Sequence, residues 1–176
     1  MTDATADPSV EATKSRPTAD FLYETFYGGA IGGSILALFF LIVDALARQP
    51  LFTPSLIGTV LFTDAAASAT VEVQLDMIAY FSVVHLATFL LTGAAMSWLY
   101  RWLNPDSRRP VVLAAVLFAL LTGSFALFGL TMAPGLLSEL GLAWIALGNL
   151  LTAIGMIVFL EKVHVDGDKT TKTGHR

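Results

Sequence analysis

Four long apolar segments separated by polar stretches dominate the pattern of hydrophobic and polar positions. They cover residues 28–47, 77–100, 111–133 and 140–160, and Asp44 is the only Asp, Glu, Lys or Arg inside them. A helix needs about 20 residues to cross the bilayer core, because each residue advances it by about 1.5 Å. The pattern therefore predicts an all-α integral membrane protein, a four-helix bundle whose helices span the bilayer.

Polar segments flank this region on both sides. Residues 1–27 and 161–176 hold 14 of the 24 charged residues, so we expect two polar tails around a transmembrane domain at 28–160. Ala45-Leu46-Ala47 resembles a signal-peptide cleavage site. The preceding polar stretch is too long and too acidic for a typical signal peptide, so we expect the first span to be retained.

The basic residues predict the orientation of the spans. Nine of the ten lie in the two tails or between spans two and three, and only Arg48 lies in the other two connections. Cytoplasmic segments carry the excess of Lys and Arg, so both termini are expected in the cytoplasm. Residues 48–76 and 134–139 would then lie outside. Trp98, Tyr100 and Trp102 would mark one bilayer interface, and Tyr80 and Trp144 the other.

The outer loop, residues 48–76, contains an amphipathic stretch at 53–62. Thr53 is a suitable N-cap and Pro54 suits the first helical position. Ser55, Gly58 and Thr59 fall on the face opposite the large apolar residues. We expect a short interfacial helix on the outer surface. The alternative is a re-entrant loop that fills the mouth of the bundle.

Composition excludes several classes of protein. Of the 176 residues, 55% are hydrophobic and 14% are charged, and the mean hydropathy is +0.70, which excludes a soluble enzyme. With a net charge of −4 and no basic stripe, the chain lacks the electrostatic signature of a nucleic-acid binder. The chain has no cysteine, and no known catalytic motif is present, so no enzymatic activity is expected.

Small residues recur at helical spacing in the first and last spans. Such positions let another helix approach closely, and they predict a closely packed bundle without a wide pore. They indicate either a docking surface for a partner subunit or packing within the chain's own bundle. The helix-docking candidates are Gly28, Gly32, Gly33, Gly141, Gly148 and Gly155.

Polar residues form a stripe along the second span. Ser82, His85, Thr88 and Thr92 fall on one side of a helix, which we expect to face protein rather than lipid. Two further polar residues, Ser124 and Asn149, lie at a depth similar to that of His85. Hydrogen bonds from His85 to either of them are feasible, giving a ligand-binding or structural polar cluster of Ser82, His85, Thr88, Ser124 and Asn149.

His85 admits three roles: a structural hydrogen bond between helices, ligation of haem or a chlorophyll-type pigment, and proton or ligand chemistry. A single intramembrane histidine excludes a bis-histidine haem within this chain. Asp44 lies one turn before Arg48, which predicts an ion pair at the interface. His164 and His175 lie in the charged C-terminal tail and are expected to be solvated.

One stretch resembles a known group of proteins. Residues 28–62 combine a glycine-rich span ending at Asp44 with Arg48-Gln49-Pro50-Leu51-Phe52-Thr53-Pro54-Ser55-Leu56-Ile57-Gly58. Together with Gly148-Asn149, they resemble small bacterial inner-membrane proteins of uncharacterised function. The resemblance implies a bacterial four-helix protein of the inner (cytoplasmic) membrane and brings no activity.

Two main function classes follow from these features, and a third ranks below them. The first is a non-catalytic accessory or scaffold subunit of a larger membrane complex, plausibly a respiratory or photosynthetic one, partnered by other membrane subunits. The second is a small binder or transporter of an apolar or quinone-like ligand, with His85 and Asn149 lining a cavity. The third is a pigment or haem carrier that uses His85.

Overall fold

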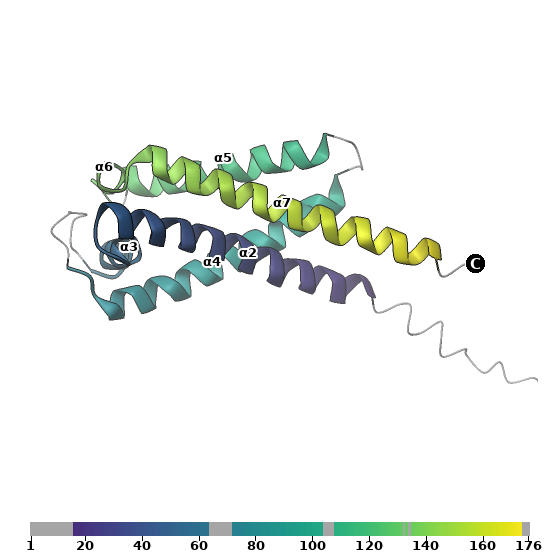
Figure 1. Cartoon of the computed structure of the whole chain (residues 1–176), viewed down its shortest axis with the longest axis horizontal. Coiled ribbons are helices and arrows are strands. Elements are labelled where there is room, and N and C mark those ends of the chain that lie inside the picture. The colour runs from purple at the N-terminus through teal and green to yellow at the C-terminus, as the bar shows by residue number, and fades with distance from the viewer. Residues whose placement is uncertain (1–15, 64–71, 104–107, 132, 134, 174–176) are drawn as a thin grey trace, which may run out of the picture.

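The computed structural model describes residues 16–63, 72–103, 108–131, 133 and 135–173. Every regular element in these residues is a helix (Figure 1). Four of them, α2, α4, α5 and α7, are long and apolar enough to cross a membrane, which confirms the predicted all-α architecture. The helices are α2 (Arg16–Ala47), α3 (Phe52–Phe62), α4 (Leu75–Trp102), α5 (Arg109–Thr131), α6 (Leu136–Leu140) and α7 (Leu142–Thr173).

Two of the helices extend well beyond the predicted spans. α2 begins at Arg16 and α7 continues to Thr173, so parts of both segments interpreted as polar tails are helical. Pro17 lies in the first turn of α2, where the missing N–H breaks no intrahelical hydrogen bond. The apolar segments thus predict the existence of each helix but not its ends, because polar side chains can continue a helix beyond its apolar part.

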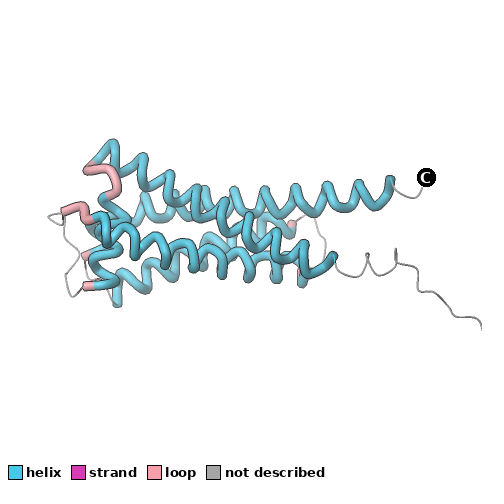
Figure 2. The backbone as a smooth tube through the Cα atoms, turned by 90° about the horizontal axis from the view of Figure 1, so that it is seen from below, coloured by secondary structure: helices cyan, strands magenta, loops and turns pink. Residues whose placement is uncertain are grey.

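The four long helices run alternately up and down, and they pack in the order α4, α2, α7, α5. The first turns of α2 and the last turns of α7 lie at the same end of the bundle, which we call the tail end (Figure 2). The short helices α3 and α6 lie at the opposite end, the α3 end (Figure 1). α4 and α5 approach each other near the tail end and diverge toward the α3 end (Figure 1).

Backbone-to-backbone contact joins α2 to α4. A Cβ atom added at Gly29 would lie 2.5 Å from the carbonyl oxygen of Phe89, and one added at Gly93 would collide with the carbonyl oxygen of Thr25. Each helix therefore presents a glycine to the backbone of the other. This close approach is the packing that small residues permit between membrane helices.

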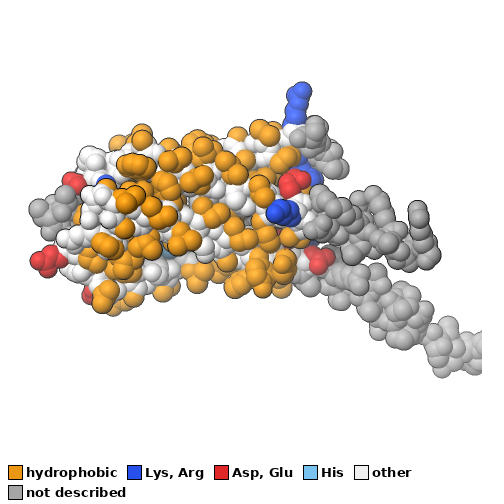
Figure 3. Space-filling model, in the orientation of Figure 1, with side chains coloured by type: hydrophobic (Ala, Val, Ile, Leu, Met, Phe, Trp, Pro, Cys, Tyr) orange, Lys and Arg blue, Asp and Glu red, His pale blue; other side chains and the backbone are white. Residues whose placement is uncertain are grey.

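Two clusters of buried side chains form the core. The cluster nearer the tail end joins α4, α5 and α7, with Tyr100, Leu117 and Met156 almost fully buried. The cluster at the α3 end joins α2, α3, α6 and α7, with Leu56 and Leu140 inaccessible. The flanks between the two ends are apolar, and the charged side chains gather at the ends, as expected for a bundle that spans a bilayer (Figure 3).

The short helix α3 differs from its prediction. It begins at Phe52 rather than after an N-cap at Thr53, and the preceding Leu51 takes a left-handed conformation with φ of 66°. Ser55, Gly58 and Thr59, predicted on the face opposite the large apolar residues of an interfacial helix, are buried. A side chain at position 58 would collide with the backbone of Met77. α3 therefore packs into the end of the bundle, closer to the alternative of a segment that fills its mouth.

Candidate functional site

A cavity of about 540 Å³ lies on the α3 side of the bundle, where α4 and α5 diverge. Its volume is within the usual range for small-molecule sites. Residues of α2, α3, α4, α5 and α7 line it. The glycines predicted a closely packed bundle, and this cavity is a gap in that packing. Leu38, Val84, Thr88 and Ser124 line it and are also exposed, so the cavity is continuous with the apolar flank of the bundle.

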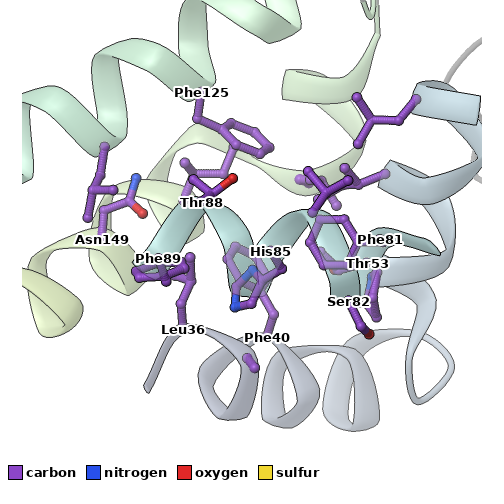
Figure 4. Close-up of a pocket in the computed structure, with 18 of the residues that line it drawn as sticks. Leu36, Phe40, Thr53, Phe81, Ser82, His85, Thr88, Phe89, Phe125 and Asn149 are labelled. Carbon is purple, nitrogen blue, oxygen red and sulfur yellow. The ribbon is translucent and has the colours of Figure 1, made fainter. Parts of the chain in front are cut away.

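His85 occupies the wall of this cavity on α4. Its Nε2 lies 3.0 Å from the carbonyl oxygen of Gly33 on α2, a position where an added Cβ would lie 3.3 Å from the ring of Phe89. Phe81 and Phe89, one turn before and after it, place their rings 5.4 Å and 4.8 Å from the imidazole (Figure 4). The three rings form a continuous aromatic wall because residues four apart share a helix face.

The other members of the predicted polar cluster also line the cavity, but they do not bond to His85. Asn149 donates from Nδ2 to Thr122 Oγ1 at 3.2 Å, which joins α7 to α5. The Ser124 hydroxyl donates to the carbonyl of Leu121 at 3.1 Å. The feasible His85–Asn149 and His85–Ser124 hydrogen bonds are therefore not formed, and each residue bonds to another partner instead.

The polar stripe of α4 was expected to face protein, but parts of it are exposed. Ser82 and Thr88 are exposed and line the cavity, and Thr92 lies beyond it. Two of these hydroxyls bond to their own helix: Ser82 donates to the Ile78 carbonyl at 2.7 Å and Thr92 to the Thr88 carbonyl at 2.8 Å. Internal hydrogen bonds of this type let a hydroxyl tolerate apolar surroundings.

Asp44 and Arg48 form the predicted ion pair, at 3.5 Å, and the structure gives Asp44 a further role. Its fully buried carboxylate accepts from Thr53 N at 2.6 Å and from Thr53 Oγ1 at 2.7 Å. The N-terminus of α3 is thus capped by a residue of α2. Arg48 also donates to the Glu139 carbonyl, which ties α2 to α6.

A second polar site, at the tail end, was missed by sequence reasoning. Glu24 is buried and pairs with Arg101 at 2.8 Å and with His164 at 3.5 Å. His164 was expected to be solvated, but it packs on the Tyr100 ring at 4.2 Å, because α7 continues through the supposed tail. His175 lies outside the described residues.

The same tail-end site includes a second ion pair. Arg109 pairs with Glu161 at 3.6 Å and stacks over the ring of Tyr100 at 3.9 Å. The Tyr100 hydroxyl donates to Glu161 at 2.9 Å. The sequence did contain a signal for this site. Glu24 lies one turn before the first span, and the basic residues that follow span two were predicted on the same side of the membrane.

Most of the helix-docking glycines face the chain's own helices. Side chains at Gly32 and Gly33 would meet Met156 and Phe89, and one at Gly148 would meet Leu36. A side chain at Gly155 would collide with Ile35, whereas one at Gly28 would make ordinary contact with Phe159. Gly141 has a φ of 79° and begins the turn between α6 and α7.

No group of three His, Cys, Asp or Glu side chains converges in the described residues. His85 is the only described histidine on the cavity. Ligation of a haem or chlorophyll metal through Nε2 would require breaking its hydrogen bond to Gly33.

No protein-family model, curated protein or solved structure matches the chain. The resemblance to small bacterial inner-membrane proteins stays a prediction.

Proposed function

We propose that this protein binds an apolar, quinone-like amphiphile in the cavity beside His85. The observation that carries the proposal is the cavity itself: about 540 Å³ lined mainly by apolar side chains, with His85 and Asn149 among the few polar ones. Largely apolar pockets with a few convergent polar groups are typical small-molecule sites.

The opening of the cavity favours a ligand that comes from the bilayer. Several lining side chains belong to the exposed apolar surface of α2 and α4, including Leu38 and Val84. An alkyl tail can leave the cavity between α4 and α5 and remain in lipid, while the head group stays near His85. The proposal needs binding alone and no catalytic step.

We place the protein in the bacterial cytoplasmic membrane, with the tail end on the cytoplasmic side. The support is the positive-inside rule, because Arg101, Arg108, Arg109 and Lys162 belong to the tail end and Arg48 to the α3 end. The cavity would then open in the outer half of the bilayer.

Membership of a larger complex remains a separate prediction. Its main support in the sequence was the set of small-residue helix faces, and Gly32, Gly33, Gly148 and Gly155 meet side chains of this same chain. These glycines thus no longer argue for a partner subunit, whereas the cavity independently favours ligand binding.

A matched pair of variants tests the proposal. Thr88→Phe places a large ring in the cavity, while Thr92→Phe places the same ring one turn further along α4, outside the cavity. The probe is decyl-benzoquinone, titrated into protein in lipid nanodiscs and followed by saturable quenching of tryptophan fluorescence. We expect Thr88→Phe to weaken binding at least tenfold and Thr92→Phe to leave it within twofold. Absence of saturable quenching, or equal effects of the two variants, would contradict the proposal.

A further inference from the structure

We infer that the cavity recognises its ligand as a hydrogen-bond donor, so that a hydroxylated aromatic head group, as in a phenol or quinol, binds better than its carbonyl or ether counterpart. The inference rests on the proposed function and specifies the chemistry of the head group. Three features carry it: the protonation pattern of His85, the use of donors within the protein, and the aromatic wall.

The hydrogen-bond partner of His85 determines which ring nitrogen keeps a lone pair that can accept a hydrogen bond. A carbonyl oxygen only accepts, so the Nε2 that lies 3.0 Å from Gly33 O carries the proton. In a neutral imidazole the lone pair then belongs to Nδ1. No described residue donates to Nδ1, and the side chain lines the cavity. His85 therefore offers the ligand an acceptor.

The donors around the cavity are mostly occupied by the protein itself. The hydroxyls of Ser82 and Ser124 donate to carbonyls of their own helices, and that of Thr53 donates to Asp44. A ligand carbonyl would therefore find few donors here. The hydroxyl oxygens of these three residues still have lone pairs that can accept a hydrogen bond from a ligand. Thr88 is the exception, because its hydroxyl has no such bond and can either donate or accept.

Asn149 adds a second acceptor. Its Nδ2 donates to Thr122, and no described residue donates to its Oδ1. The residue lines the cavity from α7, across from His85 on α4 (Figure 4). Two acceptors on facing helices suit a head group that carries hydroxyls.

The aromatic wall selects for a flat head group. Phe81 and Phe89 flank His85, and Phe125 of α5 lies on the other side of the cavity (Figure 4). Aromatic side chains pack on a ligand ring in offset or edge-to-face arrangements. The ligand class that meets all three requirements is an aromatic ring with a hydroxyl and an alkyl tail.

A pair of redox-inert probes tests the inference directly: 4-heptylphenol and its methyl ether, 4-heptylanisole. Binding of each to the full-length protein in nanodiscs is measured by calorimetry, with empty nanodiscs subtracted. His85→Phe removes the acceptor but keeps an aromatic ring in the wall. Comparing the phenol-to-ether ratio of affinities between wild type and this variant cancels the different partitioning of the probes into lipid.

We expect the wild-type protein to prefer the phenol roughly fivefold more than the variant does, the contribution of about one hydrogen bond. If both probes bind and the ratio is the same in both proteins, the inference is overturned while apolar binding stands. If neither probe binds to the wild type, the proposed function fails as well.

A second measurement does not depend on the variant folding. ¹⁵N-histidine labelling of the wild-type protein reports the tautomer of each imidazole, and the signal that responds to 4-heptylphenol is assigned to His85, the one described histidine on the cavity. We expect a neutral ring protonated at Nε2 whose Nδ1 signal shifts when 4-heptylphenol binds. A ring protonated at Nδ1 would overturn the inference.

Discussion

Replacement of Asp44 by alanine should release α3 from the end of the bundle. The Asp44 carboxylate is fully buried and holds Thr53, the second residue of α3, through both its backbone N–H and its hydroxyl. No other hydrogen bond of the described residues caps this end of α3 through a side chain. Alanine removes both bonds and leaves the Thr53 N–H without its acceptor.

The expected loss follows from these contacts. A hydrogen bond to a charged group contributes about 1.5–3 kcal/mol, so the two bonds from Thr53 contribute about 3–6 kcal/mol. The ion pair with Arg48 is longer, at 3.5 Å, and Arg48 is 23% exposed, so it adds about 0–1 kcal/mol. Arg48 also keeps its bond to the Glu139 carbonyl. Allowing for relaxation, we expect Asp44→Ala to lower the free energy of unfolding by about 3–5 kcal/mol.

The assay is unfolding by SDS in mixed micelles, followed by circular dichroism. Asp76→Ala is the control, because Asp76 is an exposed acid in the first turn of α4 and should cost at most about 1 kcal/mol. Asp44→Asn, which keeps one acceptor oxygen, should fall between the two. Equal stabilities of Asp44→Ala and Asp76→Ala would refute the assignment of Asp44 as the anchor of α3.

Two further predictions concern the contacts between helices, and the same unfolding assay measures both. Gly29→Ala should destabilise the bundle by about 1–3 kcal/mol, because the new Cβ would lie 2.5 Å from a carbonyl oxygen of α4. Gly123→Ala is the control: it has open space around it and should be neutral or stabilising by up to about 1 kcal/mol. Equal effects would show that α2 and α4 are not in backbone contact. Glu24→Gln should cost about 2–4 kcal/mol because it removes the buried negative charge that lies 2.8 Å from Arg101. The exposed Asp20→Asn should change stability by less than about 0.5 kcal/mol. A Glu24→Gln protein as stable as wild type would contradict a structural role for the tail-end site.

The sequence was sufficient to predict the four long helices, and the physical reason is their length. An uncharged apolar run of about 20 residues has few stable states other than a membrane helix. The ion pair of Asp44 with Arg48 was also predictable, since it depends only on spacing along one helix. The cavity-lining positions of His85 and Asn149 belonged to the second of the three predicted function classes.

Contacts between distant segments were not predictable in the same way. The Glu24–His164 pair joins two segments that composition assigned to tails, and it depends on α2 and α7 both continuing past the apolar spans. His85 was paired with Asn149 by depth alone, but depth does not specify which neighbour is nearest. The partner that His85 has is the backbone carbonyl of Gly33, which a pattern of side chains does not reveal.

The position of α3 connects the fold with the proposed ligand site. Leu56 of α3 is inaccessible in the core at the α3 end, and Ile57 belongs both to that core and to the cavity wall. α3 also supplies Thr53, Pro54 and Leu61 to the cavity wall. Asp44 holds α3 in this place, so the residue that stabilises the fold also maintains the cavity. A ligand that binds beside His85 should consequently lose affinity in Asp44→Ala, even though Asp44 itself does not line the cavity.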